Sequence, residues 1–226
     1  MVQFFATVNL KNGAFKRINL VWEETYLFAF SSRRAESVKK HMEELKKSGI
    51  EVPQSAPMIY QIDPYLVRSC ERIYVIGNST SAEVELFFAC DERGREYITV
   101  GSDHTDREME RESIARSKQL CSKPVAPVFW SVDEIEDHLD ELIIECRAMI
   151  DGAFVSYQKG KVGEIMELQK LKTLAKQRSR SGKFSFFSGT LPLLNGELIF
   201  SNRYELALFD PVLQRSIRFG YMVEVV

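Results

Sequence analysis

The sequence predicts an α+β fold in which short strands form a mixed, twisted β-roll or barrel with few helices. Many segments of four to eight residues are apolar or alternate between apolar and polar residues, which is typical of strands. Asn12-Gly13 and Asp151-Gly152 each lie between two such segments and favour hairpin turns. The strands are not regularly interleaved with helices, which disfavours a doubly wound parallel sheet.

The N-terminal part of the chain is predicted to be rich in strands. These strands are expected over residues 2–9, 14–21 and 25–30. A helix rich in lysine and glutamate is expected over residues 34–47. Pro53 and Pro57 then indicate a loop. We therefore expect a small β-rich part, residues 1–52, that ends in a helix acting as a lid, followed by a main domain over residues 53–226.

The main domain is predicted to consist mainly of strands. They are expected over residues 72–76, 82–89, 96–100, 141–149, 153–157, 184–188, 204–209 and 214–225. One helix is expected over residues 106–118, and a second over residues 162–178, where apolar residues recur at three- and four-residue spacing. With 226 residues, the chain is long enough to bury a substantial core.

The composition disfavours several classes of function. Thirty Lys and Arg residues face 32 Asp and Glu residues, so no basic field exists to hold nucleic acid or an anionic membrane. The four cysteines form no CxxC pair, so neither a thiolate metal cage nor a redox dithiol is predicted. No apolar run approaches the ~20 residues that cross a bilayer, and no signal peptide is recognisable. We expect a cytoplasmic protein that binds its partner through a local site.

Three acidic residues form the first candidate site. Glu83 and Glu85 are two positions apart in a predicted strand, so their side chains share one face with Cα atoms about 7 Å apart. By itself this pair also fits an exposed polar strand face. Asp103 follows the next strand, and three carboxylates on neighbouring strands would form an oxygen site suited to Mg²⁺, Mn²⁺ or Ca²⁺.

Two further segments carry candidate functional residues. His41 and Glu44 are three positions apart on a predicted helix, so the carboxylate can orient the imidazole as a general base. An exposed helical ion pair is the alternative. Gly189 and Thr190 follow an apolar strand and can hold an anionic oxygen, although an ordinary turn also explains them.

In chain order these segments resemble the motifs of the fumarylacetoacetate hydrolase family, from about residue 34 to the C-terminus. That family carries N-Y-x-x-H-x-x-E, P-x-x-F-x-K, E-x-E, N-D-V-T-A-R-D, a lysine roughly fifteen to twenty residues later, and G-T-P. The matching segments here are His41 with Glu44, Pro57-Met-Ile-Tyr60, Glu83-Val-Glu85, Ser102-Asp103-His-Thr-Asp-Arg107-Glu, Lys118 and Gly189-Thr190. The resemblance implies the β-roll of the family's C-terminal domain.

The resemblance also implies a role for each matching residue. Glu83, Glu85 and Asp103 would bind the magnesium, manganese or calcium cofactor. Lys118 would place positive charge beside an enolate, and His41, oriented by Glu44, would activate water. The expected substrate-binding residues are Thr190, Gly189, Arg107, Tyr60 and Arg34.

The activity implied by the resemblance is metal-dependent hydrolysis of a carbon–carbon bond in a small oxo acid such as an acylpyruvate, through a metal-stabilised enolate. A decarboxylase, tautomerase or hydratase using the same site is an alternative, as is a catalytically silent binding protein. The chain lacks the Asn-Tyr of the first motif and the lysine of P-x-x-F-x-K. These departures leave the substrate open. The family further implies a homodimer, in which residues 221–226 would find a partner.

Overall fold

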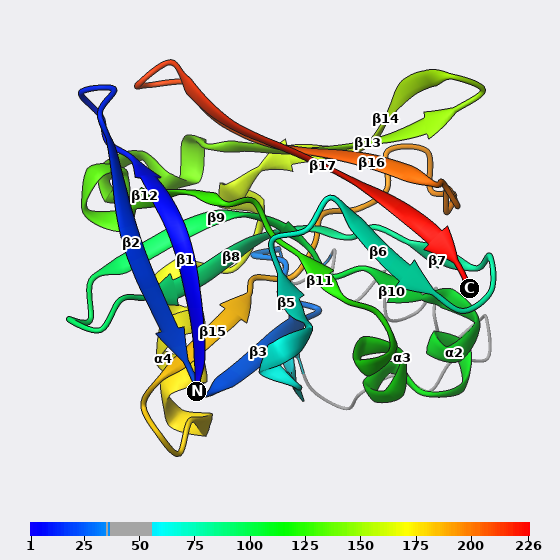
Figure 1. The fold of residues 1–226 in the computed structure, drawn as a ribbon, viewed down its shortest axis with the longest axis horizontal. Helices are drawn as coiled ribbons and strands as arrows, with labels where there is room; N and C mark the ends of the chain where they lie inside the picture. The colour runs from blue at the N-terminus through cyan, green and yellow to red at the C-terminus, as the bar shows by residue number, and fades with distance from the viewer. Residues whose placement is uncertain (35, 37–55) are drawn as a thin grey trace.

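The structure is a computed structural model that describes residues 1–34, 36 and 56–226. Two β-sheets pack against each other, and the helices lie at their margins (Figure 1). The predicted α+β architecture with a mixed, curled sheet and few helices is confirmed for this part of the chain. The predicted division between residues 52 and 53 lies outside the described residues.

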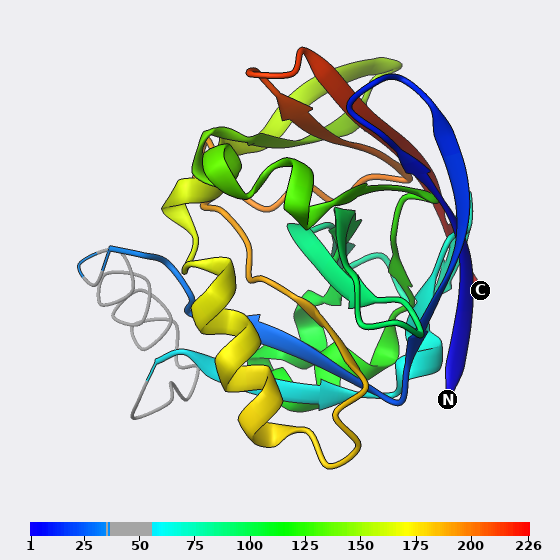
Figure 2. The ribbon, with the colours of Figure 1, turned by 90° about the vertical axis from the view of Figure 1, so that its left-hand side faces the viewer.

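The larger sheet has eight strands. In spatial order they are β2 (Phe15–Trp22), β1 (Val2–Asn9), β12 (Val128–Ser131), β9 (Glu96–Ser102), β8 (Val84–Cys90), β15 (Phe184–Phe187), β3 (Glu24–Ala29) and β4 (Met58–Ile62). The pairs β1–β12 and β15–β3 are parallel, and the others are antiparallel. The sheet is strongly curved, as the view in Figure 2 shows.

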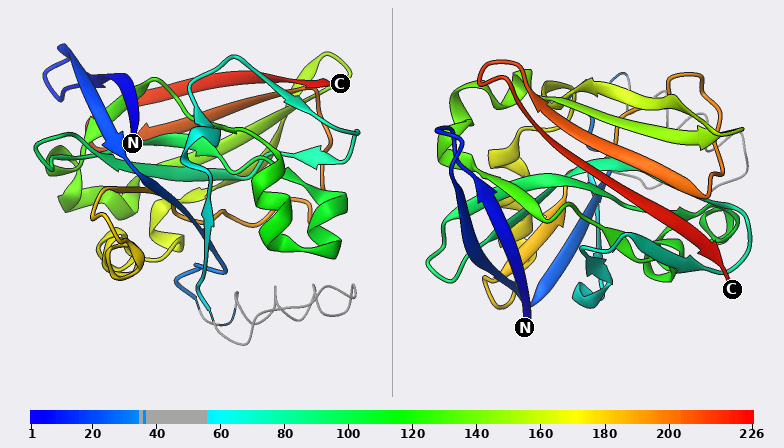
Figure 3. Two further views of the ribbon diagram at one scale, coloured as in Figure 1. Left: turned by 60° about the horizontal axis from the view of Figure 1, so that its bottom comes forward. Right: turned by 45° about the horizontal axis from the view of Figure 1, so that its top comes forward.

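The second sheet has five strands. In spatial order they are β14 (Ala153–Lys161), β13 (Ile143–Ile150), β16 (Arg203–Asp210), β17 (Arg215–Val225) and β6 (Arg72–Val75), and Figure 3 shows their long, twisted path. The turn between β13 and β14 is Asp151-Gly152, with φ of 49° and 80°, as the sequence predicts. Glycine tolerates this conformation because it has no Cβ atom.

Two short ladders connect the sheets to the helices. They are β10 (Thr105–Asp106) with β7 (Thr80–Ser81), and β11 (Lys123–Pro124) with β5 (Val67–Arg68). The helices of the described part are α2 (Arg107–Glu112), α3 (Ile114–Leu120), α4 (Leu168–Arg178) and the short 3₁₀ helices η1 (Pro64–Leu66), η2 (Val132–Glu134), η3 (Glu136–Glu141) and η4 (Val162–Glu164). None of these helices has the length and apolar character needed to cross a membrane.

The strands expected in the described residues are present, with ends that differ by a few positions, whereas both testable helix predictions were too long. The helix expected over residues 106–118 is divided at Ser113, which is extended and accepts a hydrogen bond from the amide of Arg116. This bond caps a new helix. The helix expected over residues 162–178 is interrupted because the amide of Met166 donates to the carbonyl of Ser31, at 2.7 Å. The helix predicted over residues 34–47 falls almost wholly outside the described residues.

The core explains why β8 is apolar on both faces. Val84, Leu86 and Phe88 face the cluster shared with the five-stranded sheet and α4. Phe87 and Ala89 face a second cluster, formed largely by β1, β2 and β12, where the large sheet curls over itself. A strand buried on both faces reads as a continuous apolar run. The carboxylate of Glu85 therefore enters a largely apolar interior.

Candidate metal centre

The pairing of β8 with β9 brings the three predicted ligands together. The two strands are antiparallel with Val84 opposite Ser102, so Glu83 lies across from Asp103. The amide of Asp103 donates to the carbonyl of Glu83 at 2.9 Å. Glu85 follows on the same strand face as Glu83. One carboxylate oxygen from each of Glu83, Glu85 and Asp103 lies within 4.8 Å of the others, an arrangement that can hold a metal ion.

Glu85 shows that this cluster favours a cation. The side chain is 1% exposed, and its Oε2 accepts a hydrogen bond from the amide of Gly189 at 2.7 Å. Burial raises the pKa of Glu85 well above its usual value, and the nearby carboxylates of Asp103 and Glu83 raise it further. A divalent cation would remove this repulsion, and carboxylate oxygens are the ligands that Mg²⁺ and Ca²⁺ prefer. The three residues fit such an ion.

Lys118 reaches the cluster from α3. Its Nζ lies 2.6 Å from Glu83 Oε2 and 2.7 Å from Asp103 Oδ2, and it donates to Thr105 Oγ1 at 3.0 Å. Burial alone would lower the pKa of Lys118, but the carboxylates of Asp103 and Glu83 raise it above its usual value. Lys118 is therefore an ammonium group at neutral pH and serves as a donor rather than a base.

Arg107 also supports Glu83. Its guanidinium Nη1 donates to Glu83 Oε1 at 3.1 Å and to Glu110 Oε2 at 2.7 Å, and its Nε donates to Ser81 Oγ at 2.8 Å. Burial would raise the pKa of Glu83, but Arg107 and Lys118 lower it below its usual value. Glu83 therefore stays ionised without a metal.

Lys123 is a member of the cluster that the sequence prediction did not identify. Its side chain is fully buried, its Nζ lies 2.7 Å from Asp103 Oδ1, and it donates to the carbonyl of His104 at 2.7 Å. A signal was available, because Lys123 stands twenty residues after Asp103, within the interval in which the family places its lysine. The sequence analysis selected Lys118 alone, and the structure brings both Lys118 and Lys123 to Asp103.

These ion pairs leave room for a metal. Each oxygen of Glu83 and Asp103 contacts one cationic donor. Glu83 Oε2 also accepts a bond from Thr105 Oγ1 at 3.3 Å. An ionised carboxylate has about four lone-pair sites, so Glu83 Oε1 and both oxygens of Asp103 can accept a second partner. The donors orient the carboxylates without exhausting them.

The loop after β15 holds Glu85 in place. Gly189 has a φ of 87°, and a Cβ atom built there would lie 1.8 Å from Ser31 Oγ, so only glycine fits. Thr190 Oγ1 donates to the carbonyl of Val84 at 2.9 Å and accepts from Gln158 Nε2 at 2.8 Å. The Thr190 hydroxyl thus ties the loop to β8, between the two glutamates.

Gln158 is a second residue that the sequence did not reveal. Its Oε1 accepts from the amide of Val84 at 2.9 Å, and its Nε2 also donates to the carbonyl of Leu191 at 2.6 Å. The strand pairing shifts here, because Gln158 is opposite Cys146 whereas Ser156 is opposite Arg147. The bulge turns two consecutive side chains inward, and sequence periodicity cannot anticipate it.

The structure places the other predicted residues differently. Tyr60, on β4, is partly buried, and its pKa is raised by burial in an environment that also includes the charges of Lys118 and Glu110. Arg34 is exposed, and within the described residues no side-chain contact joins it to the acidic cluster. His41 and Glu44 lie outside the described residues.

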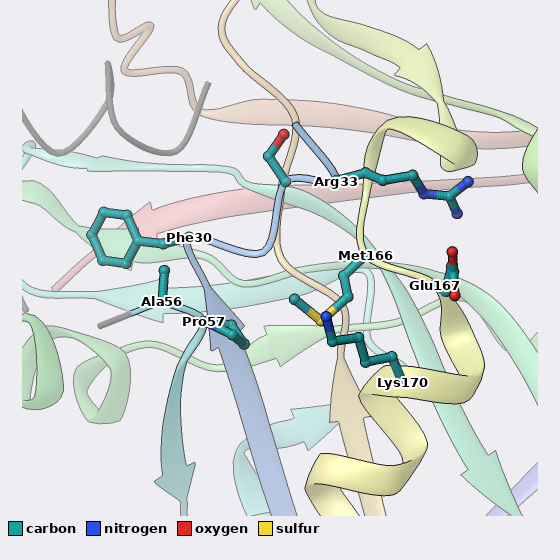
Figure 4. Close-up of a pocket in the computed structure, with 8 residues that line it drawn as sticks. Phe30, Arg33, Ala56, Pro57, Met166, Glu167 and Lys170 are labelled. Atoms are coloured by element: carbon teal, nitrogen blue, oxygen red, sulfur yellow. The ribbon is translucent and has the colours of Figure 1, made fainter. Parts of the chain in front are cut away.

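A separate cavity of about 320 Å³ is shown in Figure 4. Phe30, Ala56 and Pro57 line one side, and Met166 and Lys170 line another. None of the residues that line it belongs to the acidic cluster. The converging carboxylates, rather than this cavity, mark the candidate metal centre, because a cation needs oxygen ligands.

His104 is directed away from the carboxylates. It is fully buried and bonded to Tyr221 Oη and Thr80 Oγ1, each at 2.9 Å. Burial lowers the pKa of His104 well below its usual value, and the charge of Lys123 lowers it further. The imidazole is therefore neutral in the folded protein.

The neutral state of His104 predicts a loss of stability in acid. Below the unfolded-state pKa of about 6.5, the unfolded chain binds a proton that the folded chain excludes. From pH 7.5 to 5.5, the free energy of unfolding should fall by about 1.4 kcal/mol through this residue. Urea unfolding at both pH values measures the fall. His104→Gln should reduce it by that amount, and an unchanged fall would contradict the assignment.

The comparisons with known proteins support the fold. No curated protein matches this chain in sequence. A solved structure from Yersinia pestis CO92, described as a candidate fumarylacetoacetate hydrolase family protein, is 15% identical, with a TM-score of 0.64 over 96% of this chain and 99% of that one. A solved 2-keto-3-deoxy-D-arabinonate dehydratase, complexed with magnesium and 2,5-dioxopentanoate, is 14% identical, with a TM-score of 0.62 over 91% and 74% of the two chains.

An Escherichia coli protein described as a candidate isomerase is 12% identical, with a TM-score of 0.59 over 98% of this chain and 100% of that one. These similarities show that the chain shares the fold of these solved structures, one of which is described as a candidate fumarylacetoacetate hydrolase family protein. A family model described as "Protein of unknown function (DUF2848)" matches residues 29–221. On this match, the chain belongs to the DUF2848 family.

Proposed function

We propose that this protein is a divalent-metal-dependent enzyme that cleaves a carbon–carbon bond of a small oxo acid by hydrolysis. The observation that carries the proposal is the convergence of Glu83, Glu85 and Asp103 within 4.8 Å, next to the ammonium group of Lys118. Mg²⁺ is the proposed cofactor, with Mn²⁺ or Ca²⁺ as alternatives, because the ligands are all hard oxygen atoms. When bound, the ion supplies Lewis-acid stabilisation of negative charge on a substrate oxygen.

The protein's own residues divide the remaining work. Lys118 is held as an ammonium group between Glu83 and Asp103, so it places a positive charge beside an oxyanion that forms next to them. Loss of one such electrostatic contact typically costs ~2.7–4 kcal/mol in the transition state. Lys123 and Arg107 orient the carboxylates of Asp103 and Glu83.

Proton transfer and substrate binding complete the proposal. His41, oriented by Glu44, is proposed to activate water. The Thr190 hydroxyl is already bonded to Val84 and Gln158. We therefore propose that the backbone amide of Thr190 binds the substrate carboxylate. Three residues are proposed to contact the rest of the substrate. They are Arg107, the exposed Arg34, and Tyr60, which lies near Lys118. Dehydration is a second candidate reaction, because one structural neighbour is a dehydratase.

We also propose a homodimer. Tyr74 and Ile76, on and just after β6, are 57% and 79% exposed, and Val225 and Val226 at the end of β17 are 48% and 75% exposed. These residues are close together because β6 pairs with β17. Sedimentation equilibrium should give twice the chain mass, and Ile76→Asp should lower it to the mass of one chain.

Direct titration with magnesium tests the metal centre. Calorimetry on chelator-treated protein should show Mg²⁺ binding, and Glu85→Gln should reduce it strongly because one of three ligands loses its charge. Glu205→Gln is the matched control, since Glu205 is a half-exposed glutamate on β16 that pairs with Arg147. Equal affinity of wild type and Glu85→Gln would exclude the site. A screen of acylpyruvates and other oxo acids with Mg²⁺ then tests the activity.

The network of Gln158 should tune the metal affinity without contacting the ion. Gln158→Leu removes the bonds that join β8 to the loop of Gly189, so Mg²⁺ should bind about 10-fold more weakly. Thr25→Val is the control. It removes a buried hydroxyl bond to Ser185, at 2.8 Å, in the eight-stranded sheet that contains β8. The control should lose stability but keep its Mg²⁺ affinity. A folded Gln158→Leu or Gln158→Met protein with wild-type affinity would disprove this role.

A further inference from the structure

Glu110 is the most exposed charged side chain around the candidate metal centre. It lies on α2, one turn after Arg107, and its side chain is 20% exposed, compared with 7% for Arg107 and 5% for Lys118. Its Oε2 accepts from Arg107 Nη1 at 2.7 Å, and its Oε1 lies 3.8 Å from Lys118 Nζ. A small molecule that approaches these cations therefore meets a carboxylate.

Arg107 is poorly placed to act as an anion clamp. A free guanidinium group binds a carboxylate through two parallel N–H bonds. Here Nη1 is shared between Glu83 and Glu110, and Nε is bonded to Ser81. Glu110 thus neutralises the cation that would otherwise attract a second anionic group of a substrate.

The charges of the cluster lead to the same result. Four carboxylates face three cations, which leaves one excess negative charge when all are ionised; these residues are Glu83, Glu85, Asp103, Glu110, Arg107, Lys118 and Lys123. A divalent cation changes the excess to one positive charge, and one substrate carboxylate cancels it. A second carboxylate would leave an uncompensated charge in a poorly solvated site, which is unfavourable.

We propose that Glu110 is a specificity-determining residue, which makes the site selective for oxo acids with a single carboxylate and an uncharged distal end. Hydroxyl groups at that end suit the site, because a carboxylate accepts hydrogen bonds from them. This inference rests on the proposed function, since it assumes that the site binds an oxo acid together with a divalent ion. It adds the charge of the substrate, which the metal ligands alone do not specify.

Two probes of nearly equal size test the proposal. 2-Oxopentanoate and 2-oxoglutarate differ at the distal carbon, where the second compound carries a carboxylate. Calorimetric titration of the full-length protein with Mg²⁺ should show that 2-oxopentanoate binds at least about 10-fold more tightly, the factor that corresponds to 1.4 kcal/mol. In Glu110→Gln, which can still accept the bond from Arg107, this ratio should approach one.

Two variants control for general effects of charge and folding. Glu112→Gln removes the same charge from an exposed position on α2 and should leave the ratio of the two affinities unchanged. Glu110→Asp keeps the charge and should keep most of the selectivity, even if Glu110→Gln folds poorly. Thermal unfolding and Mg²⁺ affinity should be measured for each variant.

The possible outcomes separate this inference from the proposed function. If both probes bind equally to wild type, or if Glu110→Gln keeps the wild-type ratio, the role of Glu110 is wrong while the oxo-acid site stands. If Mg²⁺ binds but neither probe does, the proposed substrate class is wrong, and the inference fails with it.

Discussion

The structure of this site depends on the electrostatic balance between buried carboxylates and the cations that reach them. Without partners, Glu83 and Asp103 would repel each other and would be costly to remove from water. Lys118 lies between them, while Lys123 and Arg107 contact their other oxygen atoms. The balance is incomplete at Glu85, which is held by a backbone amide rather than by a contacting cation. A bound metal ion would therefore have its most favourable electrostatic interaction with Glu85.

The fold maintains this arrangement through connections between the two sheets. The β8–β9 pairing sets Glu83 opposite Asp103, and the Gly189 loop fixes Glu85 from the side of β15. Gln158, aimed inward by a bulge in β14, joins the smaller sheet to both β8 and the loop. Glu85 lies on β8, Glu83 comes directly before β8, and Asp103 comes directly after β9. The bonds of the surrounding amide and hydroxyl groups favour a preorganised site.

A shared fold leaves the chemistry open. The same architecture can support several reactions, because function depends on the side chains of the site. In this chain, Arg107 Nη1 and Nε are bonded to Glu83, Glu110 and Ser81, and Glu110 is the more accessible group. In our proposals, the residues that bind the metal therefore differ from Glu110, the residue that selects the charge of the substrate.

The sequence by itself determined the strands, both hairpins and the shared face of Glu83 and Glu85, because these follow from local periodicity and turn chemistry. It also indicated Asp103 and Lys118 through their order along the chain. Only the tertiary structure decided that Lys123 and Gln158 belong to the site, since strand pairing and a bulge bring them there from distant positions. It likewise decided the breaks at Ser113 and Met166, where a side-chain cap and a contact with Ser31 override helical periodicity. Such interactions join residues far apart in the chain or compete locally with the helix, so no single stretch of sequence reports them.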